Sequence, residues 1–518
     1  MRRGVHGIRA SALALAGMPP RPDAAPPEGV PPDLRRLFLQ VFPAVGLAMF
    51  GAALDQTIVS AALPAIARSL GEVERISWVV VSYLVATTVA APVYGRLGDA
   101  FGRRRMLLVA LGVYALGAML CAVAPSLDLL TLARMVQGFG GGGLISLSVA
   151  LIAEVVPPRE RGRFQGYIAG VFALASALGP LAGGLLTEFF GWRAVFLLQP
   201  PLSLLAAVMA VRRLRNAQPG VARGFSFDWA GLLLFALFVG PALLALDQAR
   251  RLDPSALGVA ALLAMLAGGA LFLLWRWERR APDPLLPLAV LGEPSVWRAN
   301  LLSAMVAGAF VGSIAFLPLY FFAVRGLSPS GAGLALLPLA ATAAFGAMLV
   351  GRLFARTGRT MRWSGIGLSC SAVLLLGVAY ELGAMPLWAM ATVLGLASFG
   401  FGTSFPMVQV TVQLAVPRER LGSATASVQF TRALGAATGT ALMGAVLFGA
   451  LVSQGGAAAE LFVALVNRGP EVLAALSEAA RAEFRAEMVN AFRAAFLTAA
   501  LLVAGAAWLT TRVPLRRV

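Results

Sequence analysis

Apolar segments of about twenty residues recur along most of the chain, separated by short segments that carry charges. A helix of that length crosses the roughly 30 Å hydrocarbon core of a membrane, since each helical residue rises 1.5 Å. The pattern predicts fourteen membrane-spanning helices, a number that no soluble core requires. The expected helices occupy residues 37–66, 76–97, 105–124, 129–154, 163–187, 194–211, 229–247, 255–275, 297–323, 331–351, 363–380, 386–408, 422–450 and 490–511.

The loops between these segments alternate between arginine-rich and arginine-poor. Cytoplasmic loops of membrane proteins are enriched in basic residues, so the alternation predicts that both termini are cytoplasmic. It also supports the count of fourteen, because a missed helix would break the alternation. The arginine-rich loops lie at residues 96–105, 159–163, 212–223, 276–280, 352–362, 418–420 and 512–517.

Composition agrees with a membrane protein. Of the 518 residues, 59% are hydrophobic and 13% are charged, whereas soluble domains carry about 25% charged residues. The formal net charge of +18 suggests nucleic acid as a partner, but all 42 basic residues are arginines scattered mainly through short loops, so we expect none. With one histidine, His6, and no nucleotide-binding loop, the chain predicts no metal site, no cofactor and no catalysis. Cys121 and Cys370 both lie in apolar segments, which implies no disulfide framework.

An internal repeat divides the chain. The segments 95–103 and 351–359 match at five of nine positions, and each follows the second helix of a six-helix group. Two related halves are typical of alternating-access carriers. The expected organisation is a disordered cytoplasmic tail (1–36), a six-helix bundle (37–211), a linker with two extra helices (212–296) and a second six-helix bundle (297–518) that includes a mostly helical external loop, 452–489.

Asp55 lies inside the first spanning segment. An unpaired carboxylate at that depth costs several kcal/mol, so it either holds a proton or faces a cation. Arg134 is within reach, because the two residues differ in depth by roughly 7 Å. Arg134 shares one helix face with Gln137, Gly138 and Gly141, at i, i+3, i+4 and i+7. The alternatives are a purely structural acid and an arginine that reaches back to the membrane surface.

The loop after the second segment is a candidate conformational switch, with Gly95, Asp99, Gly102 and Arg103 as its candidate residues. Asp99 stands among arginines there. We expect its carboxylate to bridge arginines or to cap a neighbouring helix, in a contact that forms in one conformation and breaks in another.

The fifth segment contains Gly179-Pro-Leu-Ala-Gly-Gly184. Gly179 and Gly183 are one turn apart, as are Pro180 and Gly184, and small residues let helices approach while proline opens the backbone ladder. The segment predicts a close, bendable helix contact that seals the outward path when a carrier faces the cytoplasm.

Two further charged residues are secondary candidates. Glu154 ends the fourth segment, where it is expected to pair with a nearby arginine. Arg432 lies about ten residues into the thirteenth segment, deep enough to need an acceptor or a water-lined cavity.

These motifs together resemble the major facilitator superfamily, specifically its fourteen-helix drug:proton antiporter branch. The resemblance covers nearly the whole chain after the tail. It rests on Leu54-Asp-Gln-Thr-Ile58, Gly95 to Arg103, Arg134-Met-Val-Gln-Gly138, Gly179 to Gly184, Trp192-Arg193, Phe227-Asp-Trp-Ala-Gly231, Arg325-Gly-Leu-Ser-Pro329 and Gln429-Phe-Thr-Arg-Ala-Leu-Gly435.

The resemblance implies an all-α membrane protein with the major facilitator fold, which is two six-helix bundles plus two extra helices between them. The Gly-Pro-x-x-Gly-Gly element is the branch's antiporter signature and favours export. Three positions depart from the pattern: Ala175 replaces a glycine, Ser60 replaces a frequent asparagine, and Ala355 stands where the second half would repeat Asp99.

The expected function is proton-coupled export of small amphiphilic or drug-like molecules across a bacterial inner membrane, with Asp55 carrying the proton and Arg134 tuning it. The proton gradient would supply the energy, and the partners would be cargo, protons and membrane lipids, with a periplasmic adaptor protein left open. An exporter of a lipid or native metabolite, or an importer, fits the same scaffold. A channel would favour a symmetric ring of polar helices, and a lipid-modifying enzyme would need catalytic residues that the sequence lacks.

Overall fold

The computed structural model describes residues 34–71, 75–214, 226–249, 254–286, 288–327, 329–453, 457–468, 472 and 477–515. The predicted tail lies outside these ranges up to residue 33, as do parts of the predicted loop 452–489. Residues 41–518 form one compact unit, to which the description below refers.

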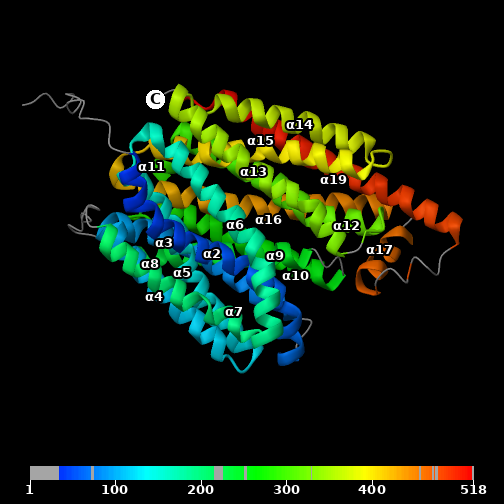
Figure 1. The fold of residues 1–518 in the computed structure, drawn as a ribbon, viewed down its shortest axis with the longest axis horizontal. Helices are drawn as coiled ribbons and strands as arrows, with labels where there is room; N and C mark the ends of the chain where they lie inside the picture. Colours follow the sequence, from blue (N-terminus) through cyan, green and yellow to red (C-terminus); the bar gives the residue numbers. More distant parts are fainter. Residues whose placement is uncertain are drawn as a thin grey trace, which may run out of the picture. The chain divides into compact units, whose positions relative to one another are not determined.

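Within the described ranges, fourteen helices are long and apolar enough to cross a membrane, as the sequence predicts (Figure 1). The spanning elements are α2 (Leu34–Leu70), α3 (Trp78–Phe101), α4 (Arg103–Val123), α5 (Leu127–Val155), α6 (Arg161–Phe190), the pair α7 (Arg193–Leu197) and α8 (Gln199–Arg213), α9 (Trp229–Ala249), α10 (Pro254–Glu278), α12 (Pro294–Ala323), α13 (Pro329–Thr357), α14 (Arg362–Glu381), α15 (Leu387–Leu414), α16 (Leu421–Ser453) and α19 (Glu478–Arg512). Four short helices complete the list: η3 (Pro158–Glu160), α11 (Leu288–Leu291), η4 (Arg418–Arg420) and α17 (Ala457–Arg468).

The last helix begins earlier than the hydrophobic pattern indicates. Residues 478–489, which we assigned to an external loop, form the first turns of α19. Their alanine, glutamate and arginine residues favour a helix without being apolar. The side chain of Ser477 also accepts a hydrogen bond from the amide of Ala480 at 3.3 Å, which caps the helix at this earlier start.

The helices pack as two groups with an added pair. In the N-terminal half (α2–α8), α5 packs on both α3 and α4; in the C-terminal half (α12–α19), α12 packs on α16 and α13 on α15. The extra helices α9 and α10 pack on each other, and α9 touches α3 and α16. Helix pairs α3–α16 and α6–α13 connect the two halves.

Glycines allow the helix backbones to approach closely at both of these connections. A methyl group built on Gly95 would lie 2.8 Å from the carbonyl oxygen of Gly422, where α3 meets α16. One built on Gly351 would overlap the carbonyl group of Gly162, where α13 meets α6. Gly95 and Gly351 occupy the same position in the sequence repeat, so the repeat corresponds to a repeated crossing of backbones.

Candidate functional site

Asp55 of α2 is the centre of a buried polar network. The side chains of Asp55 and Arg134 are both nearly inaccessible, at 0% and 1% exposure. Arg134 Nη1 donates to Asp55 Oδ2 at 2.7 Å, and Gln137 Nε2 donates to Asp55 Oδ1 at 2.9 Å. Each carboxylate oxygen therefore has a partner, and both partners come from one face of α5, the face that the sequence singles out.

Arg134 makes further contacts. Its Nε donates to the carbonyl oxygen of Val79 at 3.1 Å, and Nη1 also donates to Gln137 Oε1 at 2.8 Å. The guanidinium lies over the ring of Tyr83, 4.2 Å from its centroid. Arg134 is thus held inside the protein by α2, α3 and its own helix, so it does not reach back to the membrane surface.

Small residues on α5 allow α3 to come this close. A methyl group on Gly138 would lie 2.6 Å from the carbonyl oxygen of Tyr83, and one on Gly141 would lie 2.5 Å from its hydroxyl oxygen. Larger side chains at either position would push α3 away and remove both the aromatic face and the carbonyl from Arg134. Gly138 and Gly141 therefore act as positioning residues for the network.

The switch loop makes a second network, which joins the two halves. Asp99 accepts hydrogen bonds from the amides of Gly422 at 3.0 Å and Ser423 at 3.1 Å, in the first turn of α16. Its Oδ1 also forms an ion pair with Arg103 at 2.6 Å. The carboxylate therefore both bridges to an arginine and occupies the N-terminus of a helix, where the helix dipole favours negative charge.

Arg103 extends this network to other helices. It forms an ion pair with Glu154 at the end of α5 at 2.6 Å, and it donates to the carbonyl oxygen of Arg418 in η4 at 3.1 Å. Gly102, between α3 and α4, has φ +91°, a value that favours glycine and allows the sharp turn. We call Asp99, Arg103 and Glu154 with the two amides of α16 the latch.

Removing the charge of Asp99 is expected to open the latch. Charge-assisted hydrogen bonds contribute about 1.5–3 kcal/mol each, so Asp99→Asn should raise the population of the state with α3 and α16 separated by about tenfold or more. Hydrogen exchange of the Gly422 and Ser423 amides should accelerate by a similar factor. The matched control is Asp283→Asn, which removes an acid that pairs with Arg96, outside the latch, at 3.4 Å. Equal exchange in wild type and Asp99→Asn would contradict this role.

The glycine-rich part of α6 packs on α2, but only through two of the four predicted residues. A methyl group on Gly183 would lie 2.5 Å from the carbonyl oxygen of Ile58, and one on Gly179 would overlap the side chain of Thr57. Pro180 and Gly184 are exposed, and nothing lies within 4 Å of a methyl group built on Gly184. The prediction that all four form the contact is therefore wrong for Pro180 and Gly184, because they lie on another face of the helix.

Arg432 of α16 is partly buried and has a different environment from Arg134. Its Nη2 donates to the side-chain oxygen of Gln429, and its guanidinium lies 5.8 Å from the ring centroid of Phe405 in α15. Among the described residues no carboxylate forms a salt bridge with it. The sequence predicts that Arg432 needs an acceptor at this depth, and the structure provides the side-chain oxygen of Gln429 and the face of the Phe405 ring.

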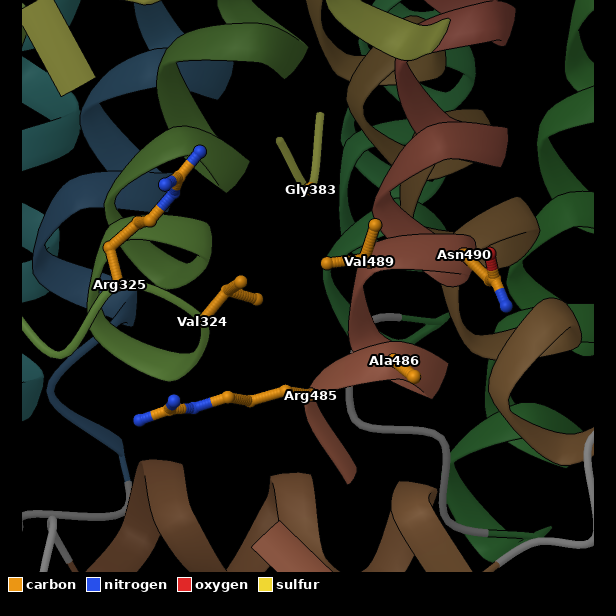
Figure 2. Close-up of a pocket in the computed structure, with 7 residues that line it drawn as sticks. All are labelled: Val324, Arg325, Gly383, Arg485, Ala486, Val489 and Asn490. Carbon is orange, nitrogen blue, oxygen red and sulfur yellow. The ribbon is translucent and has the colours of Figure 1, made fainter. Parts of the chain in front are cut away.

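A pocket of about 430 Å³ lies at the end of the C-terminal half, away from these networks (Figure 2). Figure 2 shows Arg325 and Val324 on one side of the open space, Val489 on the other side and Arg485 below it. Arg325 donates to the carbonyl oxygens of Leu382 and Met385, which fixes it to the turn after α14. All lining residues belong to the C-terminal half, so movement between the halves does not alternately expose this pocket.

Sequence reasoning did not identify the helix that Asp99 caps. The first turn of every helix has free amides, and Gly422 and Ser423 follow the short helix η4 directly, so an anion-binding helix start was visible in the sequence. Nothing in the sequence paired it with Asp99, which is more than 300 residues away.

Within the described residues, no group of three or more His, Cys, Asp or Glu side chains is placed to hold a metal ion.

Two helix bundles joined by equivalent crossings, with charged networks between the helices, define a protein that spans the membrane many times. The family model described as Major Facilitator Superfamily matches residues 45–440. The chain belongs to the Major Facilitator Superfamily, and it is a multi-pass integral membrane protein of a family of transporters that are not enzymes.

Three similar proteins agree with this assignment. The uncharacterized MFS-type transporter Rv1877 of Mycobacterium tuberculosis is 34% identical over 78% of this chain, which covers 59% of that relative's length. The MFS-type efflux pump LUC4 of a Fusarium species is 31% identical over 80% of this chain and 75% of its own. The crystal structure of the human organic anion transporter MFSD10 matches with a TM-score of 0.61 over 93% of this chain and 100% of its own; at 16% identity this shows the fold alone.

Proposed function

We propose that the protein exports small amphiphilic molecules in exchange for protons, by alternating access between the two halves. The observation that carries this proposal is the buried network around Asp55. A carboxylate that is fully paired and removed from water can exchange a proton only when its surroundings rearrange. Such a group links protonation to conformation, which a proton-driven carrier requires.

The mechanism assigns one role to each network. When α2 and α5 shift relative to each other, Asp55 loses Arg134 as its partner and takes up a proton, since an unpaired carboxylate is costly in the membrane. Return of the guanidinium to the carboxylate expels the proton on the other side. The latch holds the two halves together at one end during this step, and its release lets the cargo site change sides.

The packing of α6 on α2 supports export. Gly179 and Gly183 bring α6 against the helix that carries Asp55, within one turn of it on α2. A change at the carboxylate is therefore transmitted directly to the contact that would close the outward path. A lipid or native metabolite as cargo, or uptake in place of export, uses the same scaffold and is distinguished by the direction and identity of the transported compound.

Transport by purified protein in liposomes tests the proposal. With an imposed pH gradient, acidic on the outer side of the protein, a panel of amphiphilic compounds should include some that accumulate against their own gradient. Collapse of the pH gradient with an ionophore should abolish that accumulation. Accumulation that survives the collapse, or downhill movement alone for every compound, would contradict proton-driven export.

We propose that the protein lies in a bacterial cytoplasmic membrane with both termini in the cytoplasm. The support is the alternation of arginine-rich and arginine-poor loops across fourteen spans. Reporter fusions after residue 220 and after residue 465 are expected to report cytoplasmic and external locations, respectively. The same side for both fusions would contradict the topology.

A further inference from the structure

Arg432 is a charged group whose partner within the protein is incomplete. It lies eleven residues after the start of α16, about 16 Å along the helix. Charged side chains at such depth are usually paired with an opposite charge. Arg134, the other arginine deep inside a half, has Asp55, but Arg432 has only the side-chain oxygen of Gln429 and the face of Phe405.

The central helices of the C-terminal half supply no negative charge. Helices α12, α13, α15 and α16 contain no aspartate or glutamate along their entire length. Three acids lie next to the starts of α12 and α16 instead: Asp99 of α3, which binds the first turn of α16, Glu419 in η4, and Glu293, whose side chain caps α12. Arg432 is about 15 Å further along α16 than Gly422, to which Asp99 is bound. Within these four helices, Arg432 is thus a cation without an acid to neutralise it.

The helical position of Arg432 places it between the side of α16 that faces α3 and the side that faces α12. Successive residues of a helix turn by about 100°, so Phe430 lies about 80°, Gly435 about 220° and Arg432 about 280° from Gly422. Gly422 contacts α3, Gly435 contacts α12, and Phe430 packs on Phe235 of α9. Arg432 therefore lies between the side facing α3 and the side facing α12, away from α9. One of those helices belongs to each half.

Groups beside Arg432 match an aromatic anion. The ring of Phe405 packs on Phe310 of α12, with centroids 6.0 Å apart, which provides apolar faces from two helices. Gln409 follows one turn along α15 on the same face as Phe405, and its side-chain nitrogen is buried without a hydrogen-bond partner in the described residues. A guanidinium, a free N–H donor and aromatic faces complement a ring that carries a carboxylate or sulfonate.

We propose that Arg432 binds the anionic group of the cargo, so that the transported molecules are aromatic organic anions. This inference rests on the proposed export function and assigns its substrate class. The cargo supplies the negative charge that helices α12, α13, α15 and α16 lack, while Asp55 in the N-terminal half handles the proton. Exchange of one anion outward for one proton inward moves two positive charges inward, so a membrane potential that is negative inside drives export.

A matched pair of ligands tests the assignment. 1-Naphthoate and 1-naphthamide have nearly the same shape, but only the first is an anion. We expect the purified protein in lipid nanodiscs to bind 1-naphthoate about tenfold more tightly by calorimetry, as one charge-assisted contact provides. In Arg432→Gln, the affinity for 1-naphthoate should fall to that for 1-naphthamide. The affinity for 1-naphthamide should stay at the wild-type value, which would show that the site is still folded.

Two variants serve as controls. Arg298→Gln removes an arginine near the start of α12, where it donates to the backbone oxygen of Arg512, and should keep the full preference. Arg432→Lys keeps the positive charge but lacks the planar guanidinium, so it should keep part of the preference for 1-naphthoate. Equal affinities in the wild type, absence of 1-naphthoate binding, or a preference that survives Arg432→Gln would overturn the inference.

The same ligand separates this inference from the proposed function. Asp55→Asn should retain the preference for 1-naphthoate, because Asp55 belongs to the other half. If the wild type prefers 1-naphthoate through Arg432 but moves no protons with it, proton coupling fails and the substrate class stands. If proton-coupled export proceeds without a preference for anions, the substrate class fails and proton coupling stands.

Discussion

Asp55→Asn is expected to abolish accumulation of cargo against a gradient, while leaving binding and downhill exchange of cargo in place. Asparagine has the size of aspartate and can still accept a hydrogen bond from Arg134, but it cannot take up or release a proton. Without titration, the conformational cycle no longer depends on the pH on either side. Uptake of cargo into inverted membrane vesicles energised by respiration should therefore fall to the level of vesicles without the protein.

Asp128→Asn is the matched control for this substitution. Asp128 is an acid of the same half, but its side chain is 66% exposed and pairs with Arg75 at 2.6 Å. Exposed ion pairs contribute about 0–1 kcal/mol, so its neutralisation should leave transport unchanged. Uphill transport at the wild-type rate in Asp55→Asn would place the proton site elsewhere, with Glu154 as the next acid to test.

Gly183→Leu is expected to abolish transport or to make the protein leak protons. A side chain at this position would collide with the backbone of α2, because even its first carbon would lie 2.5 Å from the carbonyl oxygen of Ile58. Backbone cannot rotate out of the way as a side chain does, so α6 and α2 must separate. Dissipation of an imposed pH gradient in liposomes, measured with and without cargo, detects both outcomes.

Gly184 offers a control at the adjacent position of the same motif. Nothing lies within 4 Å of a methyl group built on Gly184, so Gly184→Leu should be tolerated and keep coupled transport. Tight coupling in Gly183→Leu, or equal damage in both variants, would show that packing of α6 on α2 does not seal the path.

Most of the fold can be predicted from the sequence, because the length of each apolar segment can be read directly from it. All fourteen predicted spans occur, since a membrane sets the length of each helix. The ends of the helices were harder to predict. The first turns of α19 are polar, and propensity and a cap at Ser477 extend it where hydropathy alone predicts a loop.

The candidate site could be predicted from the sequence only in part, for a geometric reason. Position along a spanning helix gives the depth of a residue, so Asp55 and Arg134 could be placed at similar depth. Depth does not say which helix a side chain faces. The sequence therefore did not reveal that Pro180 points away from α2, that Asp99 binds the start of α16, or that Phe405 lies beside Arg432.

Proton movement driven by a cargo gradient tests the central claim most directly. Liposomes containing the purified protein and a pH-sensitive dye would receive a gradient of an exported compound, with no imposed pH difference. The account predicts that protons move opposite to the cargo in the wild type and that Asp55→Asn shows no proton movement. Cargo movement in the wild type without protons, or equal proton movement in Asp55→Asn, would contradict it.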